Sequence, residues 1–527
     1  MTQAFHDRLP ASFAARFAWT FALCLPALAA SQPAHAQATV ETLDACFFTT
    51  PYNAPVLEQE CGYVIVPENP DRTDSPDIKL GFMRLPARTD APKEPLFMLA
   101  GGPGETFIMP DTLLLFADLF LGPILDDRDV VFVDQRGTAH AVPRLDCPNF
   151  YGLSWSIYEQ GLDEAQSLEV GREALAACVG DARNSGIDLD QYNSVSIAAD
   201  MDAARQALGY DRIVLYGASY GAQLGQHFMR DFPDSLVSVV LDGANSLSSK
   251  SWVEDRVRDA DVGLERLAAL CEADAKCGDA YDVPAMVDQA MALFDDGPID
   301  ASFRDADGTE FSVAVTASDL ASTIFESQTG QIGIRSLPLI LDAILADGRT
   351  SAAAILGELK GETLLGSRDA APEGGAVLMH MAVVCSDDPV LSAEEMIVEP
   401  DASTFARVFG QTILEEYLEL CRAVDVAPLP DDTDLDVTTD VATLVLAGDL
   451  DVRTPAIRSQ LVAETLPRAT FVLFPEGTHV QLGEINQCAG TILRAFLADP
   501  NAEVDTSCIA DMPRRGFVLP DGTISTD

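Results

Sequence analysis

Basic residues are scarce in this chain of 527 residues, which has 33 lysines and arginines against 83 aspartates and glutamates. The formal net charge is -50 at pH 7. Such a chain repels nucleic acid and anionic membrane surfaces, so neither is an expected partner. The charge is typical of adaptation for solubility or salt, although its field also favours cationic substrates such as free peptide amino termini.

Long apolar segments are also missing. The apolar run Phe17–Ala30 is too short for a membrane span and follows two arginines, and no later segment is long and apolar enough to cross a bilayer. Small residues at Ala34 and Ala36 then occupy the two positions that a signal peptidase reads. We therefore predict a signal peptide over residues 1–36 and a periplasmic or secreted protein. Cys24 lies in a poor context for lipoprotein processing, so no lipid anchor is expected.

The chain lacks paired CxxC motifs and the Cys/His spacing of a zinc site, and we expect neither a metal nor an organic cofactor. An even number of cysteines in an exported chain indicates disulfides. We expect neighbours along the chain to pair, which closes short loops such as Cys271–Cys277. The ten cysteines that follow the predicted signal are Cys46, Cys61, Cys147, Cys178, Cys271, Cys277, Cys385, Cys421, Cys488 and Cys508.

Internal repeats and low-complexity tracts are absent, and short apolar runs alternate instead with helical patterns such as Ser196–Tyr210. This alternation predicts an α/β fold, with a mostly parallel sheet covered by helices on both faces. The expected strands are Gly62–Glu68, Ile78–Ala87, Pro95–Ala100, Asp129–Asp134, Arg212–Gly217, Leu236–Gly243, Val441–Gly448 and Ala469–Gly477.

The strand pattern almost disappears between residues 247 and 440, where helical patterns dominate. We interpret residues 247–440 as a helical cap, inserted between a first core segment at 37–246 and a second at 441–527. The acidic stretch Ala427–Asp440 lacks the central glycine and terminal glutamate of a calcium-binding EF-hand, so we interpret it as a solvated linker.

Ser219 lies in the sequence "GASYG", between an expected strand and an expected helix. This context is typical of the G-x-S-x-G nucleophile elbow, a sharp turn that lifts a serine hydroxyl above the edge of a sheet. The glycines on either side relieve crowding at the turn. We predict that Ser219 is a catalytic nucleophile.

A serine nucleophile needs a general base, and histidine is rare here, with only four copies after the predicted signal. His479 follows the last expected strand and comes after the serine, in the order Ser, Asp, His that this architecture uses. His140 precedes the serine, His227 lies in the helix after it, and His380 lies in an apolar helical segment. We predict His479 as the base.

The acid that orients the histidine is expected after the penultimate strand, where "LAGDLDVRTP" offers Asp449 and Asp451. Asp451 is favoured because it lies deeper in the loop. Asp449 remains an alternative that would brace the loop, and Asp242, at the end of an earlier strand, is a more distant one.

Acyl transfer also needs N–H donors for the oxyanion. One is expected from Tyr220, the residue after the nucleophile, and the other from Gly102 in "LAGGPGETF", where glycines let the backbone approach a substrate closely. The competing interpretation of this stretch, a phosphate-binding loop, lacks the G-K-[ST] ending.

The motifs "GGPG", "DQRGT", "GASYG", "GDLDVRTP" and "GTHV", in this order, resemble those of the proline iminopeptidase and tripeptidyl aminopeptidase branch of the α/β-hydrolases. The resemblance is strongest over Gly62–Gly243 and Val441–Phe496. It implies an α/β-hydrolase fold with a helical cap, and structural support of the active-site loops by "DQR" at Asp134–Arg136. The site residues that it implies are Ser219, Asp451 and His479 as a catalytic triad, with Gly102 and Tyr220 as oxyanion donors.

Members of this family often carry "HGGPG", whereas here Ala100 replaces the histidine. Their cap carboxylates bind the free amine of the substrate, and Glu326 is a candidate for that role. The chain is thus expected to be an exported serine aminopeptidase acting on a peptide or small ester. The alternatives are a carboxylesterase on the same fold or a hydrolase-like binding protein without activity.

Overall fold

The structure of the chain is a computed structural model, which describes residues 38–48, 57–117, 121–249, 252–368, 376–390, 392–484 and 486–526. The predicted signal peptide, residues 1–36, lies outside the described residues. Residues 36–527 form one compact unit. None of the helices in the described ranges is long and apolar enough to span a membrane.

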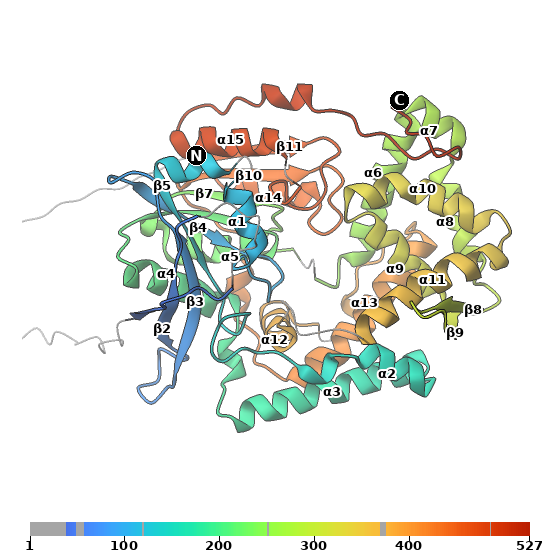
Figure 1. Ribbon diagram of the computed structural model, residues 1–527, viewed down its shortest axis with the longest axis horizontal. Helices are drawn as coiled ribbons and strands as arrows, with labels where there is room; N and C mark the ends of the chain where they lie inside the picture. The colour runs from blue at the N-terminus through green and yellow to red at the C-terminus, as the bar shows by residue number, and fades with distance from the viewer. Residues whose placement is uncertain are drawn as a thin grey trace, which may run out of the picture. The chain divides into compact units, whose positions relative to one another are not determined.

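Nine strands within the described residues form one sheet, in the order β1-β2-β3-β5-β4-β6-β7-β10-β11 (Figure 1). β5, β4, β6, β7, β10 and β11 run parallel, whereas β1, β2 and β3 form an antiparallel edge. The strands are β1 Thr39–Thr42, β2 Glu60–Pro67, β3 Asp77–Leu85, β4 Lys93–Leu99, β5 Arg128–Val133, β6 Ile213–Ala218, β7 Leu236–Asp242, β10 Ala442–Gly448 and β11 Ala469–Phe474. All eight expected strands are confirmed, and β1 was missed.

Helices cover both faces of this sheet, as expected for an α/β fold. Phe97 and Met98, which are adjacent on β4, point to opposite faces of the sheet. Phe97 belongs to the hydrophobic core that includes α4, α5 and α14, whereas Met98 belongs to the core that includes α1 and α15. The core helices are α1 Pro110–Ala117, α4 Ser194–Ala207, α5 Tyr220–Asp231, α14 Ala456–Thr465 and α15 Gln487–Ala498.

A second hydrophobic core lies among the helices on the other side of the molecule in Figure 1. These helices, called the helical part below, are α6 Arg256–Ala273, α7 Ala275–Ala280, α8 Val283–Ala292, α9 Ala317–Ser327, α10 Gln331–Leu345, α11 Arg349–Arg368 and α13 Thr404–Val424. α12 Val377–Asp387 packs instead in the core of the sheet. α9 begins with a capping box, in which Thr316 and Asp319 each accept the other's backbone N–H.

Two features of this helical part were not expected. A β-hairpin, β8 Ile299–Arg304 and β9 Glu310–Val315, forms a separate two-stranded sheet. In addition, α2 Leu153–Gln160 and α3 Glu164–Asn184 precede the nucleophile in the chain but contact the helical part. The Tyr158 hydroxyl donates to the Ser312 carbonyl at 2.9 Å, and Arg183 donates to the Val424 carbonyl at 3.1 Å. The boundary expected at residue 247 remains a prediction.

Five disulfides join neighbouring cysteines along the chain, which confirms the expected pairing: Cys46–Cys61, Cys147–Cys178, Cys271–Cys277, Cys385–Cys421 and Cys488–Cys508. Cys385–Cys421 ties α12 to α13, whereas Cys271–Cys277 ties α6 to the adjacent α7.

We predict that removing Cys385–Cys421 destabilises the protein more than removing Cys271–Cys277, with each pair replaced by alanine. The sequence separations are 36 and 6 residues. A longer closed loop restricts the unfolded chain more, and the difference amounts to about 1.5 kcal/mol. The free energy of unfolding, measured in urea without reductant, checks this. A larger loss for the Cys271–Cys277 pair would contradict the loop-entropy explanation.

Candidate active site

Ser219 lies at the turn between β6 and α5, with φ 55° and ψ -122°. This left-handed backbone is strained for a residue with a side chain. The flanking glycines make the turn feasible, because a Cβ at Gly217 would lie 2.1 Å from the Gly221 carbonyl oxygen, and one at Gly221 would lie 2.3 Å from the Leu99 carbonyl oxygen. The backbone of Ser219 therefore has the geometry of a nucleophile elbow.

Asp451 and His479 lie together after the two neighbouring strands β10 and β11. The His479 Nδ1 is 2.9 Å from Asp451 Oδ2 and 3.1 Å from Oδ1. Because a carboxylate only accepts, Nδ1 carries the proton and Nε2 is left able to accept one. The carboxylate also accepts from the N–H of Arg453 and from the N–H and hydroxyl of Thr454, at 2.9, 2.9 and 2.6 Å.

Electrostatics keep the Asp451 carboxylate ionised. Burial acts to raise its pKa, but the attraction and hydrogen bond of His479 and the hydrogen bonds of Thr454 outweigh burial, so the pKa lies below its usual value. A buried, ionised carboxylate fixes the imidazole ring and would stabilise its protonated form.

The two alternative acids have other partners. Asp449 forms an ion pair with Arg266. Asp242 accepts the N–H groups of Gln481 and Leu482 at 2.8 and 3.0 Å. Burial raises the pKa of Asp242 to about 6 against these hydrogen bonds. Asp242 therefore holds the loop that follows His479.

The elbow and the histidine loop meet at the end of β7. The Ser219 N–H donates to the Asp242 carbonyl at 2.9 Å, and a Cβ at Gly243 would lie 3.4 Å from the His479 Nδ1. On the other side, a Cβ at Gly101 would lie 3.1 Å from the Ser219 Cβ. The loop "LAGGPGETF", called the glycine loop below, follows β4. Ser219 and His479 follow β6 and β11. The structure brings all three to one edge of the sheet, because the strands β4, β6, β7, β10 and β11 are parallel neighbours and their carboxyl ends lie at the same edge.

The three other described histidines lie elsewhere. His140 Nδ1 is 3.0 Å from an Asp134 carboxylate oxygen. His227 is buried in α5, where burial and the nearby Arg230 lower its pKa to about 3. His380 Nδ1 is 3.0 Å from the Pro103 carbonyl oxygen, and its Nε2 is 3.0 Å from the Tyr417 hydroxyl. His380 therefore joins the glycine loop to α13, a role that its apolar sequence context gave no signal for.

The "DQR" segment braces the same glycine loop. The Gln135 side chain donates to the Ala100 carbonyl at 2.9 Å, and the Thr106 hydroxyl donates to Asp134 at 2.5 Å. Arg136 is fully buried and forms two hydrogen bonds with Asp200, at 2.7 and 2.8 Å. Tyr220 is the first residue of α5, where backbone N–H groups have no partner within the helix.

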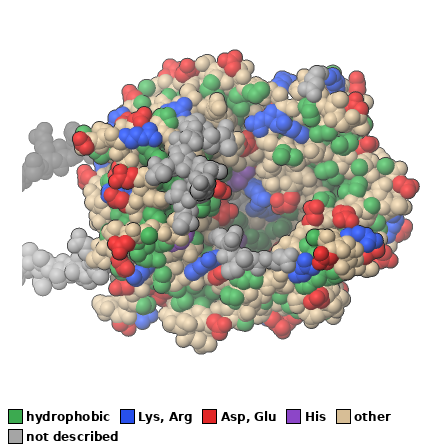
Figure 2. Space-filling model, in the orientation of Figure 1, with side chains coloured by type: hydrophobic (Ala, Val, Ile, Leu, Met, Phe, Trp, Pro, Cys, Tyr) green, Lys and Arg blue, Asp and Glu red, His purple; other side chains and the backbone are tan. Residues whose placement is uncertain are grey.

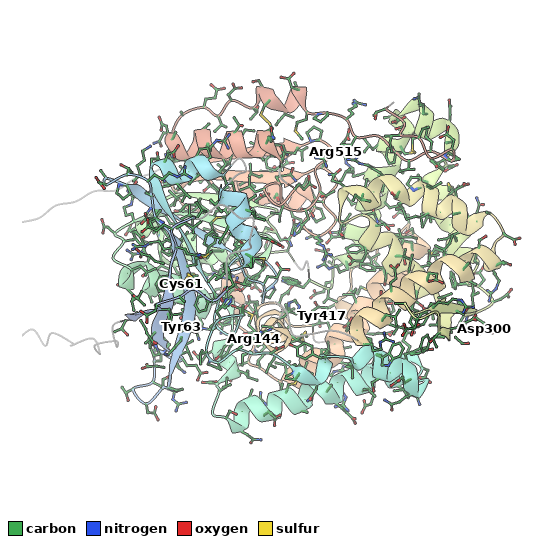
Figure 3. The ribbon with its side chains drawn as sticks, in the orientation of Figure 1. Cys61, Tyr63, Arg144, Asp300, Tyr417 and Arg515 are labelled. Carbon is green, nitrogen blue, oxygen red and sulfur yellow. A yellow bond between two sulfur atoms is a disulfide. The ribbon has the colours of Figure 1, made fainter. Side chains whose placement is uncertain are left out.

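A cavity of about 520 Å³ adjoins the glycine loop. It lies between that loop and the residues of α6, α9, α12 and α13, and Figure 2 shows a hollow in this part of the face with acidic, basic and histidine side chains inside. Figure 3 shows Tyr417, from α13, between the sheet and the helical part. Glu326 lines the cavity, as its predicted role requires, but it pairs with Arg453 at 3.0 Å.

Beneath the elbow lies a buried polar network that the sequence did not indicate. The Tyr220 and Ser194 hydroxyl oxygens are 2.6 Å apart, and Ser194 donates from its N–H and its hydroxyl to Asp387 on α12. Burial raises the pKa of Asp387 to about 7. Among the residues that the structure describes, no three acidic, histidine or cysteine side chains converge to form a metal site.

Comparisons with known proteins give two family profiles and several similar proteins. Residues 94–298 match the profile of the alpha/beta hydrolase fold family, and residues 406–508 match that of TAP-like proteins. Serine protease Hip1 of Mycobacterium tuberculosis is 24% identical over 468 residues, covering 83% of this chain and 84% of that protein. Tripeptidyl aminopeptidase of Streptomyces coelicolor is 28% identical over 214 residues, 39% of each chain. The solved proline iminopeptidase of Mycobacterium smegmatis is 15% identical, with a TM-score of 0.37, covering 83% of this chain and 98% of that one.

The fold and these matches define the class of protein as a hydrolase with the α/β-hydrolase fold. Within that class, residues 406–508 match the TAP-like profile, and the chain is similar to proteins named as peptidases, which include serine protease Hip1 and tripeptidyl aminopeptidase.

We predict that Asp387→Asn makes the stability of the protein less dependent on pH between about 4 and 7. The folded protein keeps the Asp387 proton up to about pH 7, whereas the unfolded chain releases it near the usual value of 3.8. The free energy of unfolding of the unmodified protein therefore falls as pH rises through this window, and asparagine removes that contribution. Urea unfolding at several pH values measures it. Asp300→Asn, on the exposed part of β8, is the control, and parallel pH profiles for the unmodified protein and Asp387→Asn would contradict the assignment.

Proposed function

We propose that this protein is an exported serine aminopeptidase, which releases residues from the N-termini of peptides through an acyl-enzyme. The observation that carries the proposal is the buried Asp451–His479 pair at the strand ends, beside the strained turn that presents Ser219. The peptidase names of the relatives support the choice of peptide substrates.

In the proposed mechanism, Ser219 Oγ attacks the carbonyl carbon of the scissile bond while His479 Nε2 takes the hydroxyl proton. Asp451 stabilises the imidazolium that results. The N–H groups of Tyr220 and Gly102 bind the oxyanion of the tetrahedral intermediate. His479 then gives the proton to the leaving amine, and water releases the acyl group from Ser219 by the same steps in reverse.

The cavity is the proposed site for the N-terminal part of the substrate. Glu326 is the proposed partner of the free amine, with Arg453 holding its carboxylate in the absence of substrate. The five disulfides and the predicted signal peptide support export, because structural disulfides persist in oxidising compartments. A carboxylesterase is the second candidate, since the same residues would cleave an ester.

We expect Ser219→Ala to lower kcat/KM by about 10⁴-fold or more while the protein stays folded, because no other hydroxyl replaces the nucleophile. Hydrolysis of tripeptidyl and aminoacyl anilides, together with labelling by a fluorophosphonate, measures this. Ser154→Ala, an exposed serine on α2, is the matched control and should keep full activity and labelling. Labelling that survives in Ser219→Ala would move the nucleophile to another serine.

We expect anilides with a free amino terminus to be cleaved at least about tenfold faster than their N-acetylated counterparts, since a charged amine contributes about one charge-assisted hydrogen bond. The measurement compares kcat/KM for both anilide series and for simple esters, with Ser219→Ala as the blank. Equal rates on blocked and free substrates, with faster ester cleavage, would favour the carboxylesterase.

A further inference from the structure

Arg256, the first residue of α6, lines the cavity next to the glycine loop. Its Nε–H donates to the Trp252 carbonyl at 2.9 Å, which fixes the direction of the guanidinium. In the described part of the chain, its two Nη groups have neither a hydrogen bond nor an ion pair. An arginine has five N–H donors, so four of them remain without a hydrogen bond to the described residues.

Two acids near Arg256 in the sequence are already paired. Asp255 and Asp259 bind Arg458 at 3.0 and 2.6 Å, and Asp255 also binds Arg258 at 3.1 Å. The other arginine of the cavity, Arg453, is paired with Glu326. Arg256 is therefore the cation of this cavity that has no carboxylate partner among the described residues.

The surroundings make this lack of a partner costly. Burial lowers the pKa of Arg256, against attraction by Asp259, and the positive charges of Arg453 and Arg458 lower it further. The side chain remains charged at neutral pH because an arginine starts from such a high pKa. Arg256 is half-buried, and a charge that is partly withdrawn from water without a partner is unfavourable, so an anion that enters the cavity gains a favourable interaction.

The walls of the cavity strengthen that interaction. Trp252, Phe325, Phe409 and Ile413 supply apolar surface around Arg256. Apolar walls with a few polar groups are typical of small-molecule sites, and exclusion of water strengthens the attraction between opposite charges. The lining also carries two carboxylates, Glu105 and Glu326, and Glu326 is paired with Arg453.

We propose that Arg256 forms a carboxylate-binding subsite of the cavity, in which its two Nη groups bind a substrate carboxylate. The inference rests on the proposed function and specifies its substrate class: peptides that carry a carboxylate as well as a free amine. Planar guanidinium groups match carboxylates with two parallel hydrogen bonds. The carboxylate comes either from an acidic side chain near the N-terminus or from the C-terminus of a short peptide.

The first test measures binding without turnover, in the Ser219→Ala protein. Calorimetry compares three tripeptides: Ala-Glu-Ala amide, Ala-Gln-Ala amide and Ala-Gln-Ala with a free C-terminus. We expect at least one carboxylate form to bind about 10- to 100-fold more tightly than the neutral Ala-Gln-Ala amide, and the form that does so identifies the source of the carboxylate.

Arg256→Gln, introduced into the Ser219→Ala protein, should remove the preference for the carboxylate-bearing tripeptide and leave the affinity for Ala-Gln-Ala amide unchanged. Arg258→Gln, from the same turn of α6 but outside the cavity, is the matched control and should keep the preference. Arg256→Lys keeps the positive charge but cannot form two parallel hydrogen bonds, so it should keep only part of the preference. This variant tests the proposal if Arg256→Gln does not fold.

The outcomes separate this inference from the proposed function. Equal affinity for all three tripeptides, or a preference that survives Arg256→Gln, would overturn the carboxylate subsite whatever the protein hydrolyses. Conversely, the tripeptide preference could depend on Arg256 while the protein with intact Ser219 cleaves no anilide or ester. That result would support the carboxylate subsite and overturn the aminopeptidase.

Discussion

Asp242, at the end of β7, is the residue on which the geometry of the site most depends. Its backbone carbonyl accepts the Ser219 N–H, and its buried carboxylate accepts the N–H groups of Gln481 and Leu482, just after His479. The Tyr216 hydroxyl donates to the same carboxylate at 3.0 Å. One residue thus ties the elbow after β6 to the loop after β11, so the relative positions of serine and histidine follow from the pairing of parallel strands.

The helical part supports the same site from the other side. Leu450 and Val452, on either side of Asp451, are buried in the core of the helices rather than in the core of the sheet. A Cβ at Gly263 of α6 would lie 2.2 Å from the Val452 side chain, which shows how closely α6 packs on this loop. His380 of α12 joins the glycine loop to Tyr417 of α13, in the helical part. The helical part therefore positions the acid and the glycine loop as well as enclosing the cavity.

Features encoded by local patterns could be predicted from the sequence. The eight expected strands are confirmed because continuous apolar runs of this length have few alternatives in a covered parallel sheet. The hairpin β8–β9 was missed although it carries a signal, the turn residues Asp307 and Gly308 between alternating segments. The roles of Ser219, Asp451 and His479 remain predictions, although the structure places the acid beside the histidine.

The sequence by itself determined the sharp turn at Ser219, because Gly217 and Gly221 are needed where backbones approach so closely. It left the disulfide connectivity open, and the expected pairing of neighbours along the chain was decided by the structure. Only the tertiary structure decided which aspartate faces His479, why Asp242 binds backbone instead, and that Arg256 faces the cavity without a carboxylate. Those outcomes depend on contacts between residues far apart in the chain. Local patterns do not encode them, because the distance between two such side chains is set by the packing of whole strands and helices.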